Sequence, residues 1–223
     1  NNLSISKKDY KKNKKNIYFI SQLREIYLYG NQKFLRINSN QVSLDKFYLP
    51  ERFLLPILSK FCEKHKYRLN ILGSFLINQK LEKSFFQNLI GESFNFIENK
   101  YRGYHYKIIN KKDNFVFIDS YLGYEALAKQ KKVCVFSFRG HFIKQKDRNF
   151  GFPLVMPKKG IFWTSQPDSN KIVKILNNMI DINSKDWKKI LNNYKKYYYY
   201  DKDNRKLSNS IYNTINNKND IKL

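Results

Sequence analysis

Residues 115–138 constrain the fold more than any other stretch of the sequence. An apolar run of strand length, Phe115 to Asp119, leads through a polar turn into a short helical pattern, and a second apolar run covers Lys132 to Phe138. Strand, turn, helix and strand in this order form the βαβ unit of a parallel sheet. The only two alanines of the chain, Ala126 and Ala128, lie on the expected helix. Their small side chains indicate a helix that packs closely against its sheet.

The sequence on either side continues the alternation of strands and helices. Further strands are expected at Ile17 to Ser21, Leu69 to Gly73 and Phe94 to Ile97. The expected helices are Pro50 to His65, which carries an apolar i, i+3, i+4 stripe, Leu81 to Leu89, and Tyr101 to Ile109 as a short helix or turn. This alternation predicts an α/β fold with a doubly wound parallel sheet. Residues 25–49 lack a regular pattern, and we expect an irregular loop there.

The sequence changes character after Phe138. Residues 139–160 contain three glycines and two prolines, but they are too aromatic for disorder, so we expect an ordered loop over the site. Helices are then expected at Asp168 to Ile180 and at Ser184 to Tyr199, the second capped by Ser184. We divide the chain into a basic linker or disordered lead-in (1–16), the sheet domain (17–182) and C-terminal helices (183–223), the last of them fraying. Because the sequence begins with Asn1, we expect an N-terminal portion to precede it.

The formal net charge of +25 favours anionic partners such as nucleic acid, an anionic membrane surface or phosphorylated substrates. Two observations weaken this argument: an AT-rich genome encodes such a composition, and the basic residues are spread along the chain. A basic module that binds nucleic acid or an anionic membrane stays an alternative hypothesis.

Cys62 and Cys134 lie in apolar patterns and indicate buried thiols in a reducing compartment. No apolar run reaches the roughly 18 to 20 residues that span a bilayer, so we expect a cytoplasmic protein, with a peripheral place on the inner membrane face as a variant.

Polar and small residues follow the expected strands. Right-handed crossovers bring the carboxyl ends of parallel strands to one edge of the sheet, where such folds bind ligands. The residues expected at this edge are Ser21, Gln22, Arg24, Gly73 and Asp119. Ser120 can cap the following helix, whose free N–H groups and dipole suit a phosphate, and Gly123 lets a ligand approach closely. The alternative is that Ser120 is only a cap, Gly123 only a packing contact and Glu125 only a helix-end carboxylate.

Other familiar chemistry is missing from the sequence. Neither a G-x-G-x-x-G fingerprint nor a P-loop occurs, and the cysteines and histidines lack the spacing of metal ligands, so we expect no metal and no cofactor. His65 is expected to be a cation at a helix C-terminus, and His105 and His141 are expected in loops. Arg139 and His141 follow a strand end and are secondary candidates for contact with a phosphate.

A resemblance sharpens these expectations. Asp119 to Ser137 resembles the signature D-S-T-L-G-Y-E-A-L-A-R-G-K-K-V-A-F-F-S of bacterial surface-carbohydrate biosynthesis proteins. These are glycosyltransferase-like proteins of the two-domain GT-B architecture, distantly similar to enzymes that transfer glycerol phosphate from its CDP derivative. Weaker similarity extends over residues 17–190. The resemblance implies that this chain is the C-terminal, Rossmann-like half, which binds a nucleotide-sugar, and that it has a helical tail.

The resemblance also implies roles for residues. Ser120, Gly123 and Tyr124 would lie by the phosphates of the donor and Glu125 by its hydroxyls, with Ser21, Gln22, Gly73 and Asp119 on neighbouring strand ends. Glu125 and Arg24 are the catalytic candidates, and Arg24 or Arg139 would stabilise the leaving phosphate. Tyr121 replaces the usual threonine, which would alter the choice of donor.

The implied function is transfer of a sugar from a nucleotide-activated donor in surface polysaccharide or lipopolysaccharide biosynthesis. The expected partners are the nucleotide-sugar, a glycan or lipid-linked acceptor and, peripherally, an anionic membrane; nucleic acid is not expected. The N-terminal half, which supplies most of the acceptor site in GT-B enzymes, would lie outside this chain. A lone half would bind donor without turning it over, and a catalytically silent domain that stabilises a partner enzyme is a third hypothesis.

Overall fold

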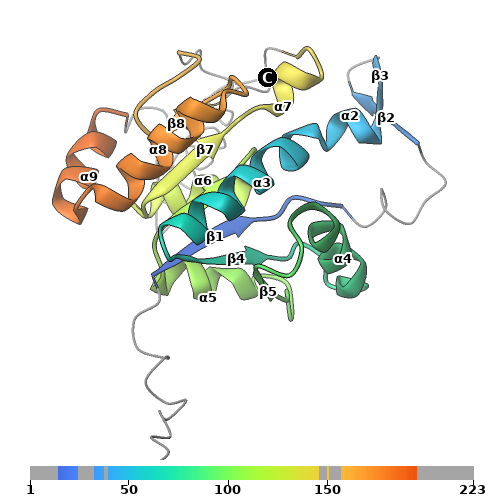
Figure 1. Cartoon of the computed structure of the whole chain (residues 1–223), viewed down its shortest axis with the longest axis horizontal. Coiled ribbons are helices and arrows are strands. Elements are labelled where there is room, and N and C mark those ends of the chain that lie inside the picture. The colour runs from blue at the N-terminus through green and yellow to red at the C-terminus, as the bar shows by residue number, and fades with distance from the viewer. Residues whose placement is uncertain (1–14, 25–32, 38–39, 146–149, 151–156, 195–223) are drawn as a thin grey trace, which may run out of the picture.

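Six parallel strands form the central sheet in the computed structural model, which describes residues 15–24, 33–37, 40–145, 150 and 157–194. The first strand lies in the middle of the sheet. The next two strands of the sheet lie on one side of it, and the last three lie on the other side (Figure 1). The order is β5-β4-β1-β6-β7-β8, with β1 (Asn16–Ile20), β4 (Arg68–Leu72), β5 (Asn95–Ile97), β6 (Phe115–Phe117), β7 (Val133–Phe136) and β8 (Trp163–Thr164). The predicted doubly wound, Rossmann-like sheet is therefore confirmed, and its direction of winding reverses between β1 and β6.

Helices cover both faces of the sheet because successive strand residues point to opposite faces. On β1, Ile17 and Phe19 face one hydrophobic cluster, and Tyr18 and Ile20 face the other. The first cluster is covered by α3 (Leu49–Lys64), α4 (Gln79–Ile90) and α8 (Ser169–Asp181). The second is covered by α5 (Tyr104–Lys111), α6 (Tyr121–Ala128) and α9 (Ser184–Asn192). Figure 1 shows α3 and α8 on the near side of the sheet and α6 on the far side.

The structure differs from the sequence-based expectation in residues 25–49. Its described part contains an antiparallel pair, β2 (Phe34–Ile37) and β3 (Asn40–Ser43), followed by the short helix α2 (Leu44–Phe47). The expected irregular loop was wrong there, because Leu35, Ile37 and Val42 alternate with polar residues and bury a small cluster of their own against Ile143.

Three local expectations near the C-terminus also needed correction. The region after Phe138 opens with a short helix, α7 (Arg139–Phe142), and β8 adds an edge strand to a segment expected to be loop. The side chain of Asn183, and not that of Ser184, caps α9, by accepting hydrogen bonds from the backbone N–H groups of the second and third residues of the helix. Residues 1–14, 146–149, 151–156 and 195–223 lie outside the described residues, so the lead-in, most of the loop and the tail stay predictions.

The close packing expected for α6 occurs at Gly123. A Cβ atom placed on this residue would lie 2.2 Å from Cγ of Phe117 on β6, so only glycine fits. Gly123 therefore lets the helix rest directly on an aromatic ring of the sheet.

Gly123→Ala is expected to lower the free energy of unfolding by about 1–3 kcal/mol, because the added methyl group must displace the Phe117 ring. Helix propensity alone favours alanine by about 1 kcal/mol, so the sign of the change separates packing from propensity. Urea unfolding gives the measurement, and the Phe117→Leu background should shrink the penalty. An equal loss of stability in both backgrounds would contradict this contact.

Candidate functional site

The carboxyl edge of the sheet brings β1 and β6 together where the winding reverses. Gln22, just after β1, donates a hydrogen bond from Nε2 to the backbone oxygen of Asp119, just after β6, at 2.9 Å. The other amide atom, Oε1 of Gln22, is buried and has no hydrogen-bond partner within the described residues. Buried polar atoms are nearly always satisfied, so this acceptor is suited to a donor from water or a ligand.

A buried arginine holds the neighbouring strand end. Arg139 donates from Nε to Asp119 at 2.6 Å, from Nη2 to Glu51 at 2.5 Å, and from Nη1 to the backbone oxygen of Phe47, whose ring also stacks on the guanidinium. Weaker bonds to the same two carboxylates engage the remaining N–H groups. Arg139 and Glu51 are each 1% exposed. The predicted contact of Arg139 with a phosphate would require this cluster to open, whereas the observed contacts position Asp119.

The charges of this cluster respond to burial in opposite ways. Burial raises the pKa of Glu51, and the adjacent Arg139 opposes this effect. Burial lowers the pKa of Arg139, but the carboxylates of Glu51 and Asp119 outweigh burial and raise it. Arg139 is therefore cationic at every physiological pH.

A second buried carboxylate, Glu82, organises the ends of β1 and β4. It is fully buried and accepts hydrogen bonds from Oγ of Ser21 at 2.5 Å and from the backbone N–H groups of Ser74 and Phe75 at 2.8 and 2.9 Å. Burial raises the pKa of Glu82, and these donors act against the rise. Gly73 lies beside it, where an added Cβ would approach Cζ of Phe96 to 2.5 Å. Ser21 and Gly73 thus serve this network in the observed arrangement.

Sequence reasoning missed Glu82 as part of the site. A signal existed, because Glu82, Phe85, Phe86 and Leu89 follow the i, i+3, i+4, i+7 spacing of a buried helix face. An acidic residue at a core position of such a stripe indicates a carboxylate with buried partners.

His105 extends the same edge toward β5. It was expected in a loop, but it lies buried at the start of α5 because its side chain faces the strand ends, and His141 likewise lies in α7. The Nε2 atom of His105 is 2.6 Å from the backbone oxygen of Gly73, while Nδ1 is buried without a partner within the described residues. Burial lowers the pKa of His105, so the neutral ring donates from Nε2.

The N-terminus of α6 offers polar groups at the same edge. Ser120 is the N-cap residue and is 6% exposed, yet its hydroxyl makes no capping hydrogen bond, so the expected side-chain cap was wrong. The following residue, Tyr121, is 85% exposed. The uncapped N–H groups and the hydroxyl of Ser120 together make this helix start a candidate anion site.

The remaining predicted residues point in several directions. Gly123 faces Phe117, so the alternative that it is a packing contact accounts for its position. Tyr124 stacks on Phe150 with ring planes 5° apart, which places this residue of the aromatic loop against α6. Glu125 accepts a hydrogen bond from Oη of Tyr106 at 2.7 Å, and Arg24 is exposed after β1. No contact joins these two catalytic candidates in the part of the chain that the structure describes.

Comparison with known proteins gives a family for the chain. Residues 1–215 match a family described as "putative O-antigen biosynthesis protein". The chain belongs to this family. None of the curated proteins matches the chain. Family membership confirms the link to surface-carbohydrate biosynthesis, while the GT-B architecture and glycosyl transfer stay predictions.

The described residues contain neither a cluster of metal ligands nor a membrane-spanning helix. No group of three or more His, Cys, Asp and Glu side chains among them could hold a metal ion. None of the helices formed by these residues has the length and apolar character needed to cross a bilayer.

Arg139→Met is expected to lower the free energy of unfolding by about 3–5 kcal/mol, because it leaves the buried carboxylate of Glu51 unpaired. Arg52→Met provides the control on the same helix as Glu51, since the pair of Arg52 with Asp45 is exposed and should contribute less than about 1 kcal/mol. Urea unfolding of both variants gives the comparison. Similar losses in the two variants would show that the buried cluster has no special weight.

The lowered pKa of His105 predicts a dependence of stability on pH. Its contribution is fully present above the unfolded pKa of about 6.5 and is lost as pH falls through that value toward the folded pKa. His105→Gln keeps an N–H donor for Gly73 and should reduce the loss of stability between about pH 7.5 and 5. Parallel pH profiles for the variant and the unmodified chain would refute this role of His105.

Proposed function

We propose that this chain binds a nucleotide-activated sugar between β1 and β6 and acts as the donor-binding half of a GT-B-like glycosyltransferase in O-antigen biosynthesis. The observation that carries the proposal is the reversal of winding at this point, directly beside the open N-terminus of α6. Open α/β sheets bind nucleotides in the crevice at such a reversal. Family membership supports a carbohydrate pathway as the setting.

The phosphates of the donor would bind at the start of α6. Its first backbone N–H groups have no partners within the helix, and the hydroxyl of Ser120 is not used for capping. The helix dipole adds a favourable interaction with negative charge. Tyr121, whose side chain projects into solvent, offers an aromatic face against which a base or sugar ring packs.

Unsatisfied acceptors support recognition of hydroxyl groups. The buried side-chain atoms without a partner, within the described residues, belong to four residues on segments that follow β1, β4 and β5: Gln22, Gln79, Asn99 and His105. All four atoms are hydrogen-bond acceptors in the observed arrangement, so each is suited to a donor from a ligand or water. Sugar and ribose hydroxyls are such donors.

The chemistry of transfer would be electrostatic in this half. As the bond between the anomeric carbon and the phosphate oxygen breaks, the helix N–H groups and the exposed cation of Arg24 would stabilise the leaving phosphate. Glu125, held by Tyr106, would accept hydrogen bonds from the donor hydroxyls. The acceptor oxygen forms the new bond and loses its proton to a base that we assign to a second domain or partner.

Calorimetric titration with UDP, CDP, GDP, dTDP and CMP tests the proposal. At least one nucleotide should bind, and Ser120→Ala should weaken it by about tenfold, the loss of one hydrogen bond to a charged group. Ser84→Ala is the matched control, because that hydroxyl bonds to a backbone oxygen on the outside of α4. Glu125→Ala should weaken the binding of a nucleotide-sugar and leave the binding of the free nucleotide unchanged. Absence of binding to every nucleotide, or equal effects of both serine variants, would overturn the proposal.

A further inference from the structure

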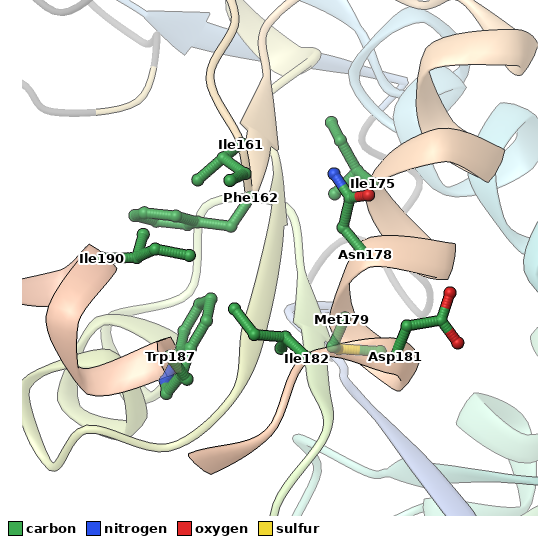
Figure 2. A pocket seen from close by; sticks show the side chains of 9 residues that line it. All are labelled: Ile161, Phe162, Ile175, Asn178, Met179, Asp181, Ile182, Trp187 and Ile190. Atoms are coloured by element: carbon green, nitrogen blue, oxygen red, sulfur yellow. The ribbon is translucent and has the colours of Figure 1, made fainter. Parts of the chain in front are cut away.

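A concave surface lies at the opposite end of the strands from the candidate donor site. It is a hollow of about 300 Å³ between the second half of α8, the start of α9 and the segment before β8. Figure 2 shows apolar side chains converging on it from these three elements: Ile161, Phe162, Ile175, Met179, Trp187 and Ile190. The side chains of Phe162 and Trp187 form the walls of the hollow and do not project into solvent, since they are 2% and 3% exposed.

The hollow continues along α8 into a second one of about 570 Å³. The two share Ile161, Ile175 and Asn178, so they form one groove, which we call the α8 groove. One end lies at the amino edge of the sheet, because Ile182 accepts a hydrogen bond from Lys132, just before β7. The other end reaches Thr164, the last residue of β8, and so lies at the carboxyl edge.

Charge is distributed unevenly along the α8 groove. Lys159, Lys171 and Lys174 line its carboxyl end. Lys171 is partly neutralised by Asp168 at 3.3 Å, but the ammonium groups of Lys159 and Lys174 have no hydrogen bond or ion pair with any described residue. At the apolar end the carboxylate of Asp181 points away from the cavity (Figure 2). The groove is therefore apolar at one end and cationic at the other.

We propose that the α8 groove binds a single-chain anionic amphiphile, an acyl or isoprenyl phosphate, with its chain between α8 and α9 and its phosphate at the lysines. Each methylene group that leaves water for the apolar end adds to affinity. Charge-assisted hydrogen bonds from Lys159 and Lys174 then fix the phosphate. This inference goes beyond the proposed donor site and does not depend on it.

Two other occupants fit the groove less well. A second copy of the chain would bring together surfaces of a molecule with a formal net charge of +25, and repulsion opposes this contact. A flat membrane surface cannot reach the apolar side chains inside the groove, because most of them are recessed. Among the apolar residues that line the groove, only Ile161, 43% exposed, projects strongly into solvent. A single chain is narrow enough to enter.

The test is titration of the full chain with dodecyl phosphate below its micelle concentration, followed by tryptophan fluorescence. Trp163 and Trp187 are the two tryptophans of the sequence, and Trp187 lines the groove, so binding should change the emission. Dodecyl maltoside, an uncharged amphiphile with the same chain, and inorganic phosphate should each bind at least about tenfold more weakly, because each lacks one half of the recognition.

Two pairs of variants locate the site. Ile161→Asp should weaken the binding of dodecyl phosphate about tenfold, whereas Ile77→Asp, at an even more exposed apolar residue outside the groove, should not. Lys159→Glu/Lys174→Glu should do the same, whereas Lys185→Glu/Lys188→Glu on α9 alters the net charge equally without touching the groove. Neither groove variant changes a buried residue, so both should fold, and circular dichroism confirms this.

Several outcomes would overturn the inference. Absence of dodecyl phosphate binding, equal binding of dodecyl maltoside, or equal effects of groove and control variants would each do so. If all variants co-sediment equally with phosphatidylglycerol vesicles and none binds monomeric dodecyl phosphate, the basic residues would instead serve contact with a membrane surface. A dimer in sedimentation velocity that Ile161→Asp abolishes would assign the groove to a second copy. Failure of this test would leave nucleotide binding at β1 and β6 unaffected.

Discussion

The buried guanidinium of Arg139 is the constraint on which the candidate site depends. A cation removed from water must be balanced by opposite charge and hydrogen bonds, and here Glu51, Asp119 and the backbone of Phe47 provide them. These partners belong to the start of α3, the segment just after β6 and the end of α2. The cluster therefore fixes four elements relative to one another at the carboxyl edge. The cluster also fixes the turn before α6, because Asp119 directly precedes the N-cap residue of that helix. The backbone oxygen of Asp119 also accepts the hydrogen bond from Gln22.

Much of the fold could be predicted because its strands are apolar on both faces. Runs such as Phe115 to Phe117 and Val133 to Phe136 are buried by helices from two sides, and this burial makes them continuous in sequence. Residues 34–47 escaped prediction for the opposite reason. Their strands are short and bury only one face, so each contributes just one or two apolar residues to the pattern.

The candidate site was predictable in position but less so in detail. Polar residues after strand ends indicate the carboxyl edge, and parallel strands bring those ends together. The pairings need tertiary structure: Glu51 and Arg139 are separated by 88 residues, and no local pattern joins them. The role of Gly123 was equally hard to predict, because a glycine permits the close approach of either a ligand or an aromatic ring. In the structure the ring of Phe117 on β6 occupies this space, so Gly123 serves the packing of α6.

The electrostatics of the carboxyl edge favour one way of holding an anion. The guanidinium of Arg139 is already paired with two carboxyl groups, so a phosphate would have to displace Glu51 or Asp119 to reach it. The start of α6, by contrast, presents N–H groups that carry no countercharge. The proposed anionic donor would therefore meet the backbone N–H groups at the start of α6 and not the guanidinium of Arg139, and Asp119, which Arg139 holds, lies directly before the N-cap residue of that helix.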